Sequence, residues 1–256
     1  RRNSSRGCRP PPRLELGSVL FHGCVPRPYS MTDGTSSPVR LARHCLGLLL
    51  HTLWPVACPV CGRLGQVLCG ECLSSLLTRQ IPRCLSCGGP APCIDHPRSA
   101  PILPGAIYEG KVREIIHRLK YGRTRALGPI LGRGLAGLHP RPFLDILVPV
   151  PLHLQSPRGY NQAEAIALGL GRAWRIPVRG LARWSCDVPA RTRLSRTERR
   201  ELRVEDFVVA PDVRGLRVGL VDDVCTTGTT LSRLASACTA EGARVEAAFV
   251  VAHVPG

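Results

Sequence analysis

Two adjacent carboxylates followed by a run of hydroxyl-bearing residues are the strongest candidates for chemistry in this sequence. Asp222 and Asp223 come directly after the apolar run 218–221, whose length and β-branching are typical of a strand buried on both faces. Because Asp is disfavoured inside strands, we expect both carboxylates at the carboxyl end of this strand, where parallel α/β sheets bind ligands. The loop that follows contains Thr226, Thr227, Gly228, Thr229 and Thr230.

This loop is suited to a phosphate, and the carboxylates are suited to sugar hydroxyls. Glycine allows close backbone approach, and the first N–H groups of a helix attract anions. Apolar residues at helical spacing follow the loop, at Leu231, Leu234, Ala235 and Cys238, and residues 245–251 predict the next strand. The plainer alternative is a strand, turn and helix in which the Asp and Thr side chains only cap.

Cysteine pairs predict metal binding between Cys58 and Cys93, where seven of the 13 cysteines lie. Two Cys-x-x-Cys pairs have the spacing of a four-cysteine zinc site, and a further pair is followed by Cys-x-x-His. Such zinc would be structural, because the protein fills all four coordination positions, and disulfides are the alternative. The first set is Cys58, Cys61, Cys69 and Cys72, and the second is Cys84, Cys87, Cys93 and His96.

Composition restricts the partners and the compartment. The 256 residues carry a formal charge of +17, which favours polyanions such as nucleic acid or phosphorylated ligands, although an arginine-rich solvated surface gives the same total. Three Trp, four Tyr and four Phe are too few for an aromatic platform that stacks single-stranded bases. No apolar run reaches the length of a membrane span and no signal-peptide pattern is present, so we expect a cytoplasmic protein.

Four regions are expected along the chain. Residues 1–38 predict a disordered extension, and because Met31 is the only methionine, the part before it is interpreted as lying upstream of the native start. Residues 39–57 predict an amphipathic helix ended by Pro55, more typical of a packed helix than of a membrane anchor. Residues 58–100 predict a double zinc ribbon, and residues 101–256 predict an α/β domain.

The α/β region repeats the order strand, then helix. Residues 107–108 and 144–151 predict strands, and residues 112–119 and 158–170 predict the helices that follow them. This order favours a parallel sheet. The second strand ends in Pro149, Val150 and Pro151, which would lie on the same edge of the sheet as Asp222.

Basic residues in this region have two interpretations each. Lys120 closes its helix, where a cation suits the helix dipole as well as a phosphate. Residues 191–207 are charged and predict either a solvated segment or an arginine-bearing flap over an anionic ligand.

Taken together, these strings resemble one family across residues 46–254. The string 218–230 resembles the phosphoribosyl pyrophosphate (PRPP) motif of type I phosphoribosyltransferases. With the other strings, the chain is similar to ComF-type phosphoribosyltransferase-like proteins. This resemblance implies a zinc ribbon followed by a type I phosphoribosyltransferase fold. The matching strings are the cysteine pairs, Tyr108-Glu109-Gly110, Leu119-Lys120-Tyr121-Gly122, Val148-Pro149-Val150-Pro151-Leu152, Arg158-Gly159-Tyr160-Asn161-Gln162 and Leu194-Ser195-Arg196.

The resemblance also implies roles for individual residues. Asp222 and Asp223 would hold the ribose hydroxyls of PRPP, and residues 226–230 would cradle its 5′-phosphate. Residues 149–151 would form the pyrophosphate-side loop, with Lys120 and Arg158 contacting the same ligand.

Three functions follow from these features. The first is transfer of phosphoribosyl from PRPP and Mg²⁺ to an unknown acceptor, linked to DNA uptake, competence or nucleotide salvage. The second is a non-catalytic adaptor that senses PRPP or a nucleotide and binds single-stranded DNA. The third is a zinc-ribbon interaction module on a degenerate fold.

Overall fold

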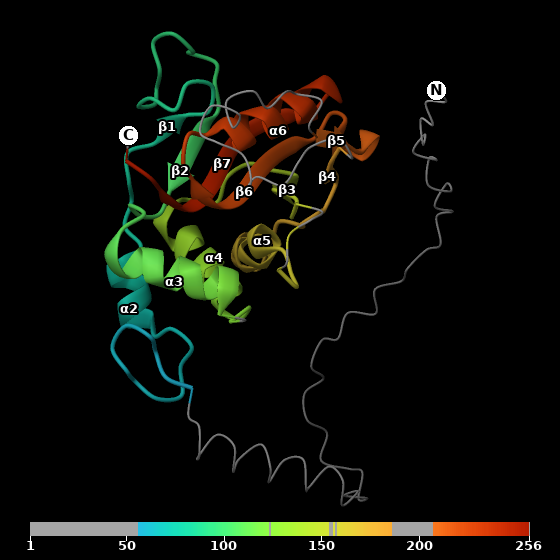
Figure 1. Ribbon diagram of the computed structural model, residues 1–256. Coiled ribbons are helices and arrows are strands. Elements are labelled where there is room, and N and C mark those ends of the chain that lie inside the picture. The colour runs from blue at the N-terminus through green and yellow to red at the C-terminus, as the bar shows by residue number, and fades with distance from the viewer. Residues whose placement is uncertain (1–55, 123, 154–155, 157, 186–206, 256) are drawn as a thin grey trace, which may run out of the picture. The chain divides into compact units, whose positions relative to one another are not determined.

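Five strands form the central sheet of the protein (Figure 1). The structure is a computed structural model that describes residues 56–122, 124–153, 156, 158–185 and 207–255. The strands lie in the order β1, β2, β7, β6, β3, and every neighbouring pair is parallel except β1 with β2. Their bounds are β1 Arg83–Cys84, β2 Pro101–Pro104, β3 Ile146–Pro149, β6 Arg217–Cys225 and β7 Arg244–His253.

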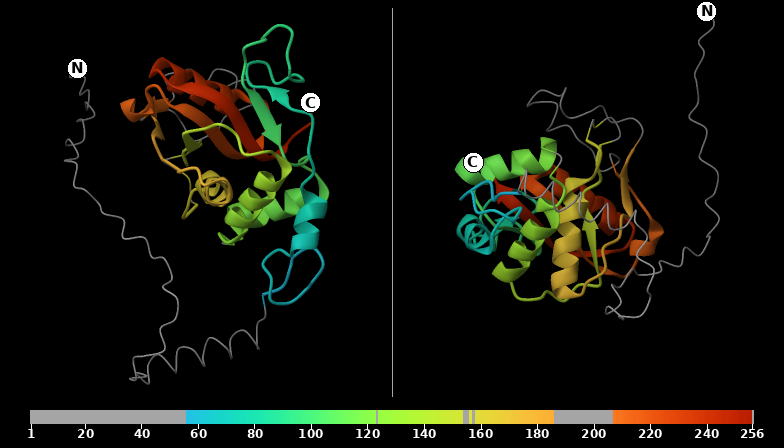
Figure 2. Two further views of the ribbon diagram at one scale, coloured as in Figure 1. Left: turned by 180° about the vertical axis from the view of Figure 1, so that it is seen from behind. Right: turned by 90° about the horizontal axis from the view of Figure 1, so that it is seen from below.

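Helices cover both faces of this sheet (Figures 1 and 2). Helices α3, α4 and α5 pack on one face, and α6 packs on the other. Residues of β3 alternate between the two layers, since Leu147 joins the first core and Ile146 and Val148 join the second. The remaining bounds are α2 Gly70–Leu76, α3 Gly110–Tyr121, α4 Leu127–Leu138, α5 Gln162–Trp174, α6 Thr229–Ala240, the antiparallel pair β4 Ala182–Trp184 and β5 Phe207–Val209, and the 3-10 turn η4 Pro211–Val213.

The expected α/β class and the parallel strands are confirmed, but two strand boundaries differ from expectation. Strand β6 continues to Cys225 instead of stopping before the carboxylates, because β7 runs alongside it and pairs Val250 with Asp222. The strand expected at 107–108 is only a single bridge between Ile107 and His253. The strand at this position in the sheet is β2, which pairs with β7.

Helix α4 was not predicted, because its glycines are poor helix formers. The structure gives them a packing role against α5. A Cβ atom at Gly132 would overlap the carbonyl oxygen of Ile166, and one at Gly128 would lie 2.5 Å from the Cβ of Ala165. On the facing helix, a Cβ at Gly169 would overlap the backbone of Pro129. Backbone approach between α4 and α5 therefore requires glycine at these positions.

Several expectations lie outside the part of the chain that the structure describes. These are the N-terminal extension, nearly all of the helix expected at 39–57, and the arginine-bearing segment up to residue 206. Among the described residues, no helix combines the length and apolar character that crossing a membrane requires.

The contact between α4 and α5 generates a stability prediction. Gly132→Ala should lower the free energy of unfolding by about 1–3 kcal/mol, because the added methyl group has no space between the two helices. Gly137→Ala is the matched control in the same helix, since a Cβ there meets nothing within 4 Å. This control should be neutral or stabilising by up to about 1 kcal/mol, through helix propensity. Urea denaturation of both variants checks the prediction, and equal effects would contradict it.

Candidate functional site

A pocket of about 420 Å³ opens where β3 and β6 end and α6 begins. Its volume is typical of small-molecule sites, which range over about 300–1,000 Å³. Residues from α3 and from the start of α5 form the opposite wall. Of the residues expected to bind PRPP, the pocket is lined by Lys120, Val150, Pro151, Arg158, Asp222, Asp223, Thr226, Thr227, Gly228, Thr229 and Thr230. Pro149 is buried at the end of β3 and is not among the lining residues.

The two carboxylates differ in environment. Asp223 is buried, and its Oδ1 lies 2.8 Å from the Lys120 Nζ of α3. Asp222 is partly buried, and its Oδ1 accepts a 2.8 Å hydrogen bond from the backbone N–H of Asp223. Burial disfavours the charge of Lys120, but the carboxylates of Asp223 and Asp222 outweigh this and raise the pKa of the Lys120 ammonium. Lys120 therefore stays cationic at neutral pH and partly neutralises the carboxylate pair.

The loop between β6 and α6 presents a helix start to the pocket. Gly228 occupies the N-cap position with φ +77°, a left-handed conformation that glycine adopts without steric cost. Next to it, the hydroxyls of Thr227 and Thr229 lie 2.8 Å apart. Hydroxyls and N–H groups at a helix N-terminus favour an anion at this end of the pocket.

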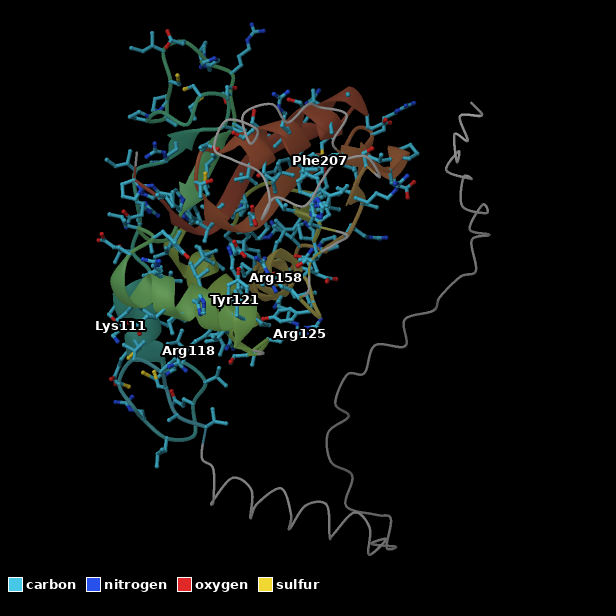
Figure 3. All side chains as sticks on the ribbon, viewed as in Figure 1. Lys111, Arg118, Tyr121, Arg125, Arg158 and Phe207 are labelled. Atoms are coloured by element: carbon cyan, nitrogen blue, oxygen red, sulfur yellow. The ribbon has the colours of Figure 1, made fainter. Side chains whose placement is uncertain are left out.

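Side chains far apart in the sequence hold the opposite wall. Arg158 donates to the Tyr121 hydroxyl at 3.2 Å, and its guanidinium lies 5.2 Å from the centre of the Tyr121 ring. The Nη1 of Arg158 also donates to the Oε1 of Gln162 at 3.3 Å. Figure 3 shows Tyr121 and Arg158 next to each other, with Arg125 nearby. Arg158 is therefore held at the pocket by partners on α3 and α5.

Two side chains fix the backbone at the end of β3. Asn161 donates from Nδ2 to the carbonyl of Val150 at 2.9 Å, and Trp184 donates from Nε1 to the carbonyl of Pro151 at 2.8 Å. The N–H of Val150 also donates to Val221 of β6. Sequence reasoning did not assign a role to Trp184, and no local pattern could have done so, because this contact spans 33 residues. The position of Asn161 before a helical segment is detectable as an N-cap, which the structure contains.

Both expected metal-ligand sets converge in space. In each set, the four ligand atoms lie within 4.8 Å of one another. The Sγ atoms of Cys61 and Cys69 are 3.7 Å apart, as are those of Cys87 and Cys93. Tetrahedral zinc with Zn–S bonds of about 2.3 Å requires sulfur atoms about 3.8 Å apart, whereas a disulfide requires about 2.05 Å. The distance of 3.5 Å between Cys93 Sγ and His96 Nδ1 also fits one zinc ion.

One thiol of each set ionises readily. Burial alone would raise the pKa of Cys58, but backbone hydrogen bonds, chiefly from Cys69, lower it to about 6. Burial also opposes ionisation of Cys84, and hydrogen bonds from Ser99 and the backbone of Cys87 lower its pKa to about 6. Thiolates are the form that binds zinc, and the convergence of four ligand atoms suits each set to a structural zinc ion that would hold the surrounding turns together.

The two clusters lie on different elements. The first precedes and enters α2, and its buried cysteines share a core cluster with Leu131 and Leu135 of α4. The second includes Cys84 of β1, the strand at the edge of the sheet. Figure 1 shows the first loop beside α2, at the bottom of the view, and the second loop beside β1, at the top.

Comparison with known proteins identifies relatives of this chain. No family model matches the sequence. The DNA utilization protein YhgH of Escherichia coli O6:H1 is 28% identical over 207 residues, covering 73% of this chain and 85% of the relative. The protein of the same name from Salmonella typhi is 27% identical over 201 residues, covering 69% and 86%. This chain is a homologue of these DNA utilization proteins. The resemblance to ComF-type proteins is thereby confirmed.

Two solved structures are also similar over part of the chain. One is the glutamine PRPP amidotransferase from B. subtilis with ADP and GMP, at 22% identity and a TM-score of 0.38. The other is described as the allosteric regulatory enzyme of purine biosynthesis, at 20% identity and the same TM-score. Each match covers 53% of this chain and 30% of the solved chain, so this protein corresponds to less than a third of either enzyme.

The ion pair between Lys120 and Asp223 generates a prediction. Lys120→Met should lower the free energy of unfolding by about 3 kcal/mol, because Asp223 is then left buried without its cation. Since the pKa of Lys120 is raised above its ordinary value, this contribution should be complete at pH 7–9 and lost as the pH rises through the raised pKa. Urea denaturation against pH measures it. Lys111→Met, which breaks an exposed pair with Glu114 on the same helix, is the control and should change stability by less than about 1 kcal/mol. Equal losses in the two variants would contradict the prediction.

The metal clusters generate a second prediction. Purified protein should contain about two zinc ions per chain, because two complete ligand sets are present among the described residues. Cys61→Ser and Cys87→Ser should each remove one zinc ion, as measured by elemental analysis. Zinc release should increase at acidic pH, since protons then compete with zinc for the cysteine sulfurs. Zinc content of one ion or none in the unmutated protein would contradict the prediction.

Proposed function

We propose that this protein binds PRPP, and that Asp222 and Asp223 hold its ribose. The observation that carries the proposal is the pocket that this carboxylate pair lines together with a hydroxyl-rich helix start, with Lys120 paired to Asp223 and Arg158 also lining the pocket. Such a pocket offers acceptors for two sugar hydroxyls between two regions that attract anions. PRPP has the matching order of groups, with a ribose between a 5′-phosphate and a pyrophosphate.

The proposed binding mode assigns each end of the ligand to one wall. The 5′-phosphate accepts hydrogen bonds from the backbone and hydroxyls of residues 226–230. The pyrophosphate lies along Val150 and Pro151, with Arg158 as its cation. Lys120 then has two anions within reach, Asp223 and the pyrophosphate. The hydrogen bonds from Asn161 and Trp184 to the carbonyls of Val150 and Pro151 keep this backbone in place before the ligand arrives.

The proposed reaction is transfer of the phosphoribosyl group. The bond between C1 and the pyrophosphate oxygen breaks, and pyrophosphate leaves with the electron pair. A lone pair of the acceptor atom then forms the new bond to C1, and the acceptor loses its proton to solvent or to the departing pyrophosphate. Bound Mg²⁺ would neutralise charge on the leaving group, and carboxylate oxygens such as those of Asp222 suit such a hard cation. The chain itself contributes positioning of the ribose and stabilisation of the leaving group by Arg158 and Lys120.

The relatives suggest the process in which this reaction takes place. They are named DNA utilization proteins, and we propose the same context for this chain, in DNA uptake or in the salvage of nucleotides in the cytoplasm. The acceptor in this proposal remains an unassigned nucleophile.

A non-catalytic adaptor is a second candidate, and a basic surface on α3 favours it. Lys111, Arg113 and Arg118 are exposed on this helix, which leads to Tyr121 and Arg158 at the pocket (Figure 3). Exposed cations on the helix that ends at the exposed Tyr121 ring suit the phosphates of single-stranded DNA. In this proposal PRPP or a nucleotide is a signal, and its binding is not followed by turnover.

The binding proposal is tested by calorimetric titration of PRPP with Mg²⁺ into the zinc-loaded protein. The unmutated protein should bind, and Asp222→Asn/Asp223→Asn should weaken binding at least about tenfold, because each amide loses the charge that accepts a ribose hydroxyl. Asp212→Asn is the matched control, since Asp212 is exposed in η4 and is not among the pocket residues. Equal binding by the double variant and the control would overturn the assignment of the carboxylates.

Transfer and adaptor functions predict different second measurements. An enzyme should release pyrophosphate from PRPP when a pool of nucleobases is added. An adaptor should instead bind single-stranded DNA with steep salt dependence, and replacing both Arg113 and Arg118 with Gln should reduce the slope by about two. Pyrophosphate release without DNA binding would exclude the adaptor, and DNA binding without release would exclude transfer to the bases tested.

A further inference from the structure

The turn of the second metal cluster lies close to residues 226–230, here called the Thr-Gly loop. A Cβ atom built at Gly88 would be 3.5 Å from the carbonyl oxygen of Thr227, which is an ordinary van der Waals contact. Gly88 has φ +74° and closes the turn by donating its N–H to the carbonyl of Cys84 at 2.8 Å. The turn that carries two of the metal ligands therefore lies so close to the loop lining the pocket that a side chain at Gly88 would touch the loop backbone.

Apolar packing joins the same two parts. Leu85, between the ligands Cys84 and Cys87, is buried and belongs to the core cluster that also contains Ile102, Cys225 and Leu231. Cys225 precedes the loop and Leu231 follows it, so this core spans both of its ends. A Cβ at Gly228 would lie 3.5 Å from Ile102 Cδ1. Leu85 is therefore part of the same buried core as the residues on both sides of the loop, and its displacement would disturb that core.

Arg83 braces the turn that approaches the loop. Its Nε donates to the carbonyl of Gly88 at 2.7 Å. Its charge also reaches the end of β6, where burial raises the pKa of the Cys225 thiol to about 11 and Arg83 partly opposes that rise. Arg83 is next to the ligand Cys84 in strand β1, so its position depends on the position of the cluster.

From these contacts we propose that Arg83 and Gly88 are positioning residues for the Thr-Gly loop. Through them, the metal in the second cluster sets the affinity of the pocket for the phosphate of PRPP. A filled cluster fixes the turn of residues 84–89, and this turn holds the loop in the conformation that accepts phosphate. An empty cluster releases the turn, so that binding must also order the loop. The part of this inference that concerns PRPP rests on the proposed function.

The first cluster provides an internal comparison. Its cysteines pack with α2 and α4. Among the contacts of the described residues, none joins this cluster to the loop 226–230. Loss of its metal should therefore leave the loop unchanged. Cys61 and Cys87 are suitable matched positions, because each is the exposed second ligand of a Cys-x-x-Cys pair.

The test compares Cys87→Ser with Cys61→Ser in the full chain. Hydrogen exchange of amides in residues 226–230 is followed first, because it does not depend on PRPP. Exchange should become at least about tenfold faster in Cys87→Ser and stay unchanged in Cys61→Ser. PRPP titration should then show affinity reduced about tenfold by Cys87→Ser alone. Retention of one zinc ion and of a cooperative melting transition establishes that each variant is folded.

Arg83 variants test the connection without touching a metal ligand. Arg83→Met should weaken PRPP binding and speed loop exchange while zinc content stays at the unmutated level, and Arg83→Lys should restore part of both. A purely structural role for Arg83 predicts no such separation of affinity from zinc content.

Each outcome decides between distinct claims. Unchanged loop exchange in both Cys87→Ser and Arg83→Met would overturn the inference. If the unmutated zinc-loaded protein binds no PRPP, the proposed function fails, while the exchange measurement still decides whether the cluster supports the loop.

Discussion

Parallel pairing of β6 with a strand on each side is the constraint on which the pocket depends. Because β3 and β7 run in the same direction as β6, the ends of β3 and β6 meet at one edge of the sheet. At the opposite end of these strands, Asp145 fixes the starting register. Its carboxylate accepts from the side chain of Arg217 at 2.7 and 3.1 Å and from the Arg217 backbone N–H at 2.8 Å. These hydrogen bonds to Arg217 lower the pKa of Asp145 to about 2, so the contact is ionised at neutral pH.

The sequence alone was sufficient to predict features that depend on residues close together in the chain. The string around Asp222 combines a β-branched run, carboxylates and a glycine-containing turn, and all of these lie within thirteen residues. The metal clusters are similar, since ligand spacing in tight turns is a local property, and both sets converge as expected. The predicted end of β6 was wrong because the low strand propensity of Asp takes no account of neighbouring strands. In the structure, β7 supplies hydrogen-bonding partners for this part of β6.

Features that depend on contacts distant in sequence were not accessible in the same way. Helix α4 has a glycine-rich sequence, and its stability comes from close packing against α5, which propensity does not register. The ion pair of Lys120 with Asp223 spans more than one hundred residues. From the sequence, Lys120 could serve the helix dipole or contact a phosphate. The structure adds a third partner, the Asp223 carboxylate inside the pocket. Trp184 is a further example, because its hydrogen bond to the carbonyl of Pro151 joins residues that are 33 positions apart in the sequence.

The short strand β1 also has a consequence for how separate copies of the chain meet. Unpaired edge strands offer backbone groups that can pair with another molecule and start aggregation. In this protein β1 covers the outer edge of β2 over two residue pairs, and the prolines at both ends of β2 have no N–H to offer. Since Cys84 is both a residue of β1 and a metal ligand of the second cluster, the same ion that would order the turn would also keep this cover in place. Loss of that ion would then expose the edge of β2 to other copies of the chain, whatever the pocket holds.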